Sequence, residues 1–169
     1  MRIRESSMLF GDFDEANCFH IEKLDLYNRD LSSHGIKSVE FVLYRPEKNK
    51  LLFVEAKTSL PIKERQGWLN SEITKISQKF MDSLQLVCGI WLRGDNGKTK
   101  LPDNYANFFE KGVEIVFILV IKRRGVNLLH IADAIKANLL KEHKLWNFSI
   151  LVLNEELARN KDLIVKNEL

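Results

Sequence analysis

The segment from Val113 to Ile121, VEIVFILVI, restricts the fold of this chain more than any other, because it is apolar at almost every position. A half-exposed strand alternates apolar and polar side chains, whereas a strand that is apolar on both faces has to be covered on both faces. Strands of this kind lie inside parallel or mixed sheets. The segment therefore predicts a buried strand, with other elements packed against each face of its sheet.

Two further segments predict a β-hairpin. Ser38–Tyr44, SVEFVLY, and Lys50–Lys57, KLLFVEAK, are short, apolar and rich in branched and aromatic residues, which is typical of strands. The link between them, RPEKN, contains a proline and an asparagine, both of which favour turns. We therefore expect the two segments to pair directly with one another.

Helices and one more strand are predicted after this hairpin. Apolar residues at three- and four-residue spacing after Asn70 predict an amphipathic helix, and Asn127 is placed to cap a second helix that extends to about His143. Trp146–Leu153 is typical of a strand, and Asn154 then begins a short helix. The apolar stripe of the first helix consists of Ile73, Ile76, Phe80, Leu84 and Val87.

The order of these elements predicts an α/β fold, with a single mixed β-sheet flanked by helices. A chain of 169 residues is long enough for one such domain and too short for two, so residues 1–169 are predicted to form one domain. Before the hairpin, Met8–Phe10 and Phe19–Ile21 suit short strands, and Asp25–Ser33 suits a helical turn that ends at Gly35.

The composition is ordinary for a soluble globular protein, with 45% hydrophobic and 29% charged residues. The net charge of +3 permits a polyanion such as nucleic acid as a partner without requiring one. Two cysteines are too few for a disulfide framework or a thiolate zinc site. The sequence shows neither a signal peptide nor an apolar run that could span a membrane, so we expect a cytoplasmic protein.

Two glutamates are expected to face one another across the hairpin. If the turn is centred between Glu47 and Lys48, paired residue numbers sum to 95, which places Glu40 opposite Glu55. Lys57 lies two residues after Glu55 and therefore on the same face of the strand. These charged side chains lie within otherwise apolar strands, so the pattern predicts a charge cluster at one end of the hairpin.

Such a cluster suits a divalent cation. Two opposing carboxylates repel one another, and burying them is unfavourable unless positive charge meets them. Lys57 offsets one of the two negative charges and leaves a surplus of one. Mg²⁺ and Mn²⁺ prefer one or two carboxylates together with water and phosphate oxygens. The pattern therefore predicts metal-assisted hydrolysis of a phosphodiester, with Lys57 beside the attacking water.

The order Val39-Glu40, fourteen residues, then Glu55-Ala56-Lys57 at the end of an apolar strand resembles the motif of the PD-(D/E)XK nuclease superfamily. The resemblance implies a restriction-endonuclease-like fold, one or two metal ions and cleavage of DNA or RNA. By position, it makes Glu40 and Glu55 the metal-binding acids and Lys57 the catalytic lysine. The sequence is also similar to a group of uncharacterised bacterial proteins, and that similarity implies no activity.

The motif departs from the superfamily pattern at two positions, since Val39 replaces its proline and Glu40 its aspartate. Many members have a further metal-binding acid on an N-terminal helix, for which Glu22 is the best candidate here. Some subfamilies use a glutamine or lysine on the following helix to contact substrate, and Gln78 and Lys79 are available there. Other acidic candidates are Glu15 and Asp25.

Other interpretations of these residues stay open. The glutamates and Lys57 also fit a structural ion pair on an open strand face, which contributes little to stability. The chain equally fits an inactive nuclease fold that binds nucleic acid or a protein partner, and nothing marks or excludes a homodimer. Lys122–Arg124, directly after the predicted buried strand, fit either a solvated strand end or an electrostatic contact with a nucleic-acid backbone.

Overall fold

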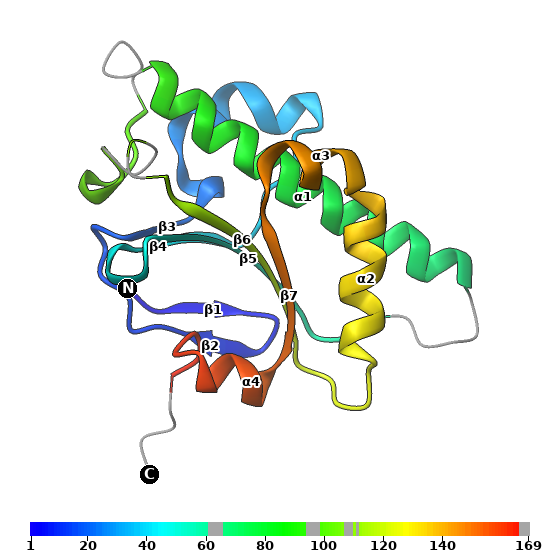
Figure 1. The fold of residues 1–169 in the computed structure, drawn as a ribbon. Helices are drawn as coiled ribbons and strands as arrows, with labels where there is room; N and C mark the ends of the chain where they lie inside the picture. The colour runs from blue at the N-terminus through cyan, green and yellow to red at the C-terminus, as the bar shows by residue number, and fades with distance from the viewer. Residues whose placement is uncertain (61–65, 94–98, 107–109, 111, 166–169) are drawn as a thin grey trace.

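The computed structural model describes residues 1–60, 66–93, 99–106, 110 and 112–165. Its centre is a five-stranded mixed sheet in the order β3-β4-β5-β6-β7, and a separate two-stranded sheet lies beside it (Figure 1). The predicted α/β fold around a mixed sheet is confirmed, whereas the small second sheet is an addition. The strands are β1 (Ile3–Glu5), β2 (Met8–Phe10), β3 (Cys18–Phe19), β4 (Phe41–Arg45), β5 (Lys50–Lys57), β6 (Glu114–Ile121) and β7 (Ser149–Asn154).

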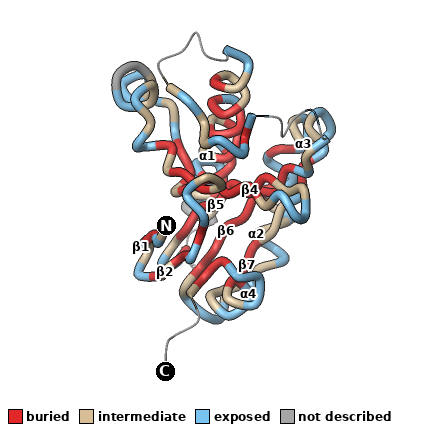
Figure 2. The backbone as a smooth tube through the Cα atoms, turned by 90° about the vertical axis from the view of Figure 1, so that its left-hand side faces the viewer, coloured by how far each residue is buried: buried red, intermediate tan, exposed pale blue. Residues whose placement is uncertain are grey.

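The strand that the apolar run predicts is β6. It pairs in parallel with β5 on one side and with β7 on the other, and all its residues after Glu114 are buried. Figure 2 shows this buried stretch within the sheet, with exposed backbone confined to the periphery of the molecule. Strand β4 is antiparallel to both of its neighbours, β3 and β5, so the sheet is mixed as expected.

The predicted hairpin is confirmed, including its register. Phe41 pairs with Val54, and Arg45 pairs with Lys50, so that paired numbers sum to 95 throughout β4 and β5. The connection is a single 3-10 turn, and Asn49 closes it in the left-handed conformation, with φ of 49°. Glu40 lies one residue before the regular ladder, although its amide still donates to the Val54 carbonyl at 3.0 Å.

The helices are α1 (Gln66–Arg93), α2 (Leu128–Asn138), α3 (Leu140–Trp146) and α4 (Glu155–Asn160). The side chains of Asn127 and Asn154 accept hydrogen bonds from the first turns of α2 and α4, as predicted. The second predicted helix is divided in two, because Leu139 leaves helical geometry with ψ of 27° while its side chain stays in the core. No helix within the described ranges is long and apolar enough to cross a membrane.

The N-terminal segment follows the prediction in part. Met8–Phe10 is a strand, and the helical turns that precede Gly35 end there, at φ of 77°. Only the first residue of Phe19–Ile21 belongs to a strand, because Ile21 begins a short 3-10 helix.

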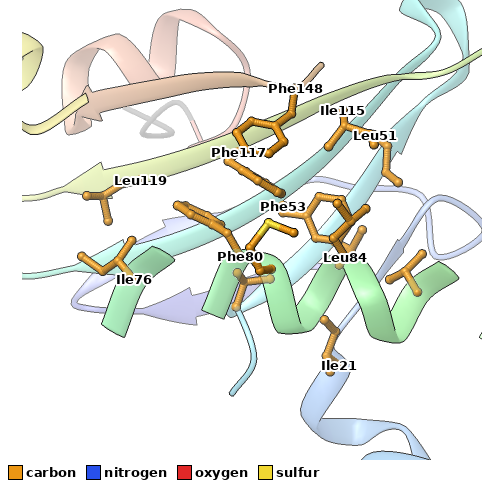
Figure 3. Packing of buried hydrophobic residues seen from close by; sticks show 14 of the residues in the cluster. Ile21, Leu51, Phe53, Ile76, Phe80, Leu84, Ile115, Phe117, Leu119 and Phe148 are labelled. Atoms are coloured by element: carbon orange, nitrogen blue, oxygen red, sulfur yellow. The ribbon is translucent and has the colours of Figure 1, made fainter. Parts of the chain in front are cut away.

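Apolar side chains fill both faces of the central sheet. Helices α1 and α2 cover one face, and the small sheet with α4 covers the other (Figure 1). On the first face, the ring of Phe80 in α1 stacks on Phe117 in β6, with centroids 4.7 Å apart, and Phe53 in β5 meets the same ring edge-on (Figure 3). This packing fixes α1 across the face of β5 and β6.

Candidate functional site

Glu55 is a fully buried acid near the carboxyl end of β5. Its side chain is 0% exposed, and it lies on the sheet face that α1 covers, two residues beyond the core residue Phe53. Burial of a charged carboxylate in such a place is strongly unfavourable unless cations and hydrogen-bond donors compensate for it. The surroundings of Glu55 therefore decide whether its charge can be maintained.

Lys79 of α1 supplies the main compensation. Its Nζ atom donates to both carboxylate oxygens of Glu55, at 2.8 and 3.0 Å. The same nitrogen lies 3.8 Å from Oε1 of Glu40, whose side chain is 21% exposed. The two glutamates expected to meet across the hairpin thus meet at a lysine ammonium group. The motif resemblance made Lys79 a candidate for substrate contact, and here it is an ion-pair partner of both acids.

Lys57 lies at the rim of the same cluster. Its Nζ atom is 3.6 Å from Oε1 of Glu55 and 3.8 Å from Oε2 of Glu72, a residue of α1. Glu72 also binds Lys75 one helical turn later, at 2.7 Å. Since the Lys57 side chain is 29% exposed, it connects the buried acid to the solvent-facing side of the site.

The backbone beside Glu40 is tied to α1. The amide of Val39 donates to Oγ of Ser83 at 3.0 Å, and the amide of Lys37 donates to Oδ2 of Asp82 at 2.8 Å. Nδ1 of His20 lies 3.1 Å from the carbonyl oxygen of Glu40. These contacts explain why the strand begins at Phe41 rather than at Ser38, since the amides of Lys37 and Val39 bond to side chains of a helix instead of a neighbouring strand.

Glu22 and Gln78, the other candidate residues, lie outside the ion-paired centre. Glu22 is exposed in a 3-10 turn and accepts a hydrogen bond from the Ser38 hydroxyl at 3.2 Å, while its charge still acts on Glu40 and Lys79. Gln78 is exposed on α1. Successive helical residues point about 100° apart, so Gln78 does not share the direction of Lys79.

The site favours an unusual protonation state for Glu40. Burial, and then the neighbouring charge of Glu55, raise the pKa of Glu40 to about 7 despite the opposing effect of Lys79. Burial also raises the pKa of Glu55, although Lys79 and Lys57 counteract it. Burial tends to lower the pKa of Lys79, but the charge and hydrogen bonds of Glu55 outweigh it and raise that pKa, so Lys79 is the charged partner.

The carboxylates of this cluster suit an ion such as Mg²⁺, which keeps several waters, better than a metal held by protein ligands alone. Among the residues that the structure describes, no group of three histidine, cysteine, aspartate or glutamate side chains could hold a metal ion. Glu40 and Glu55 nevertheless provide a pair of carboxylates, and Mg²⁺ commonly binds through one or two carboxylates and keeps several waters. A cation would share these oxygens with Lys79 or take its place.

The sequence contained a signal for Lys79 that the hydrophobic pattern alone does not use. Lys79 and Ser83 lie on the stripe of α1 that faces the sheet, because they follow Ile76 by three residues and by seven. Polar residues within an apolar stripe are candidates for buried partners. A search for such residues would have marked Lys79 and Ser83 as candidates for buried contacts, without identifying their partners.

Comparison of the chain with protein-family models, with curated proteins and with solved structures finds no match. The resemblance to the PD-(D/E)XK superfamily therefore stays a prediction.

Proposed function

We propose that this protein is a Mg²⁺- or Mn²⁺-dependent nuclease that hydrolyses phosphodiester bonds in DNA or RNA. The observation that carries the proposal is the fully buried Glu55 at the end of a hairpin, near Glu40 and with lysine ammonium groups at 2.8 and 3.6 Å. Strongly perturbed titratable groups that share one site are characteristic of functional centres. The motif resemblance to PD-(D/E)XK nucleases supports the same chemistry.

Each residue of the cluster has a role in this proposal. Glu40 and Glu55 would hold the ion, which when bound activates water and neutralises charge on the phosphate. Lys57, partly exposed at the rim, would orient the attacking water or stabilise negative charge that develops on the phosphate. Lys79 favours the ionised form of the Glu55 carboxylate and fixes its orientation, so it acts as a positioning residue.

The protonation of Glu40 predicts a pH dependence for this activity. With a pKa of about 7, Glu40 is largely protonated below that value and is then a poor metal ligand. Cleavage should therefore increase as the pH rises from about 6 to about 8.

A second function, a catalytically inactive module that binds nucleic acid or a protein partner, is favoured by one observation. The Lys79 ammonium group already contacts both acids, so the cluster contains its own cation and does not need a metal for charge balance. In such a module Glu55, Lys57 and Lys79 would serve stability alone.

Cleavage of DNA and RNA, single- and double-stranded, tests the proposal, with Mn²⁺ or Mg²⁺ at about pH 8. The variants are Glu55→Gln and Lys57→Ala, and Glu114→Gln is a matched control because Glu114 forms a salt bridge with Lys50 at the opposite end of β5 and β6. We expect cleavage by the wild type and the control, and a loss of about 100-fold or more in both site variants. Cleavage that is equal in all four proteins, or absent with every substrate, would overturn the proposal and favour the inactive module.

A further inference from the structure

A second charged site lies at the carboxyl end of β6 and β7. A pocket of about 590 Å³ opens there between α4 and the connection from β6 to α2. In Figure 1 this region lies at the lower end of the molecule, whereas α3 lies at the upper end. The residues that define its charge are Lys122, Arg123, Arg124, Glu155, Glu156 and Arg159.

Positive charge exceeds negative charge in this pocket, and part of it is uncompensated. Lys122 donates to the Ser7 carbonyl at 2.8 Å, and Arg159 binds Glu155 at 3.0 Å. Arg123 and Arg124 are exposed, and neither forms an ion pair or hydrogen bond through its side chain with the described part of the chain. Guanidinium groups without a carboxylate partner suit a phosphate group, which they bind through paired hydrogen bonds.

A second observation also points to a missing acceptor. The Nε atom of Arg159 is buried and has no hydrogen-bond partner among the residues that the structure describes, although the same guanidinium group reaches Glu155 through its Nη2 atom. A buried donor without an acceptor is unfavourable, because folding removes its water without replacing it. Because Arg159 lines the pocket, a phosphate oxygen bound there would supply the acceptor once the side chain turns Nε toward it.

The pocket is connected to the acidic cluster through the backbone. The amide of Lys122 donates to the Lys57 carbonyl at 2.9 Å, and the amide of Arg123 donates to the Thr58 carbonyl at 3.0 Å. Strands β5 and β6 are parallel, so their carboxyl ends share one edge of the sheet, where ligands of open α/β sheets commonly bind. A nucleic-acid strand along this edge would meet Lys57 and the arginines in succession.

We propose that Arg123, Arg124 and Arg159 form a backbone phosphate site that holds the nucleic-acid substrate beside the acidic cluster. This inference rests on the proposed nuclease function, and it specifies where the substrate is held. None of the described residues that line the pocket is aromatic, so no aromatic ring there stacks on a base. Contacts to the phosphate backbone are electrostatic and carry no sequence information.

Binding without metal tests this site separately from hydrolysis. Fluorescently labelled DNA and RNA oligonucleotides are titrated in EDTA with the wild type and with the double variant Arg123→Ala/Arg124→Ala, and anisotropy is measured over a range of salt concentrations. The matched control is Lys141→Ala/Lys144→Ala, which removes two exposed cations from α3. Exposed substitutions of this kind usually leave folding intact, and circular dichroism checks that they do.

The arginine variant should bind at least about tenfold more weakly, with a salt dependence reduced by about two counterions, whereas the control should stay within about twofold of the wild type. Equal losses in both variants, unchanged binding by the arginine variant, or no binding by the wild type would overturn the site. Arginine-dependent binding without cleavage would retain the site and reject the nuclease proposal. Cleavage that is unchanged in the double variant Arg123→Ala/Arg124→Ala would retain the nuclease proposal and reject the phosphate site.

Discussion

At the scale of single residues, the molecule shows how a buried carboxylate is tolerated in an apolar core. Glu55 has no exposed side-chain surface, and two lysines compensate for it from different elements, Lys79 from α1 and Lys57 from its own strand. The closer lysine makes two short hydrogen bonds, which are stronger when both partners are charged. The ion pair is therefore part of the fold whether or not a metal binds.

Removal of the ammonium group in Lys79→Met should destabilise the protein by about 2–4 kcal/mol, because it leaves a buried carboxylate with only the more distant Lys57. The double variant Glu55→Gln/Lys79→Met should be more stable than Lys79→Met alone, since it no longer contains the uncompensated charge. Urea denaturation of the wild type, both single variants and the double variant gives the coupling between the two residues. A Lys79→Met variant as stable as the wild type would show that the pair contributes nothing.

Glu40 should make the stability of the protein depend on pH. Its pKa is about 7 in the folded protein and near 4.5 in an unfolded chain, so between these values the folded state holds a proton that the unfolded state has lost. The contribution of Glu40 to the free energy of unfolding therefore falls as the pH rises from 4.5 to 7 and is constant above that range.

Glu40→Gln removes this titration while it keeps the shape of the side chain. It should stabilise the protein at about pH 8 by about 1–3 kcal/mol and have little effect at about pH 5. Denaturation curves of the two proteins at both pH values measure the difference. A variant that is less stable than the wild type at the higher pH would contradict the assignment of a raised pKa.

At the scale of elements, α1 covers one face of the sheet and also contributes side chains to the site. Its sheet-facing stripe contains Phe80 in the core, Lys79 against the acids and Ser83 against the start of β4. The hairpin and its register could be predicted because strand side chains alternate with a period of two and the turn is short. The partners on α1 could not, because the sequence does not reveal which turn of a helix lies over which strand.

Phe80→Ala should destabilise the protein by about 3–5 kcal/mol, because Phe80 is fully buried and stacks on Phe117. It should also loosen the adjacent Lys79 from Glu55. Leu92→Ala is the matched control in the same helix, since Leu92 is 74% exposed and its loss should change stability by less than about 0.5 kcal/mol. Chemical denaturation measures the stability of both variants. Equal losses of stability would show that the contact between Phe80 and Phe117 does not hold α1 in place.

At the scale of the whole molecule, the sheet has one core on each face, and Glu55, Lys57 and the arginines after β6 lie toward the carboxyl ends of its parallel strands. The apolar run of β6 predicted this layering, because it needs cover on both faces. The small β1–β2 sheet could not be predicted in full, since strands of three residues carry almost no periodic signal. The division of α2 from α3 at Leu139 also had no signal, because an apolar residue suits a continuous helix equally well.

The most direct test of the account is a calorimetric titration of Mn²⁺ into the wild type, Glu55→Gln and the control Glu114→Gln at about pH 8, where Glu40 is ionised. We predict saturable binding in the wild type and the control that disappears in Glu55→Gln, while all three proteins stay folded. Binding that survives in Glu55→Gln, or that is absent from all three folded proteins, would contradict a metal site at Glu40 and Glu55.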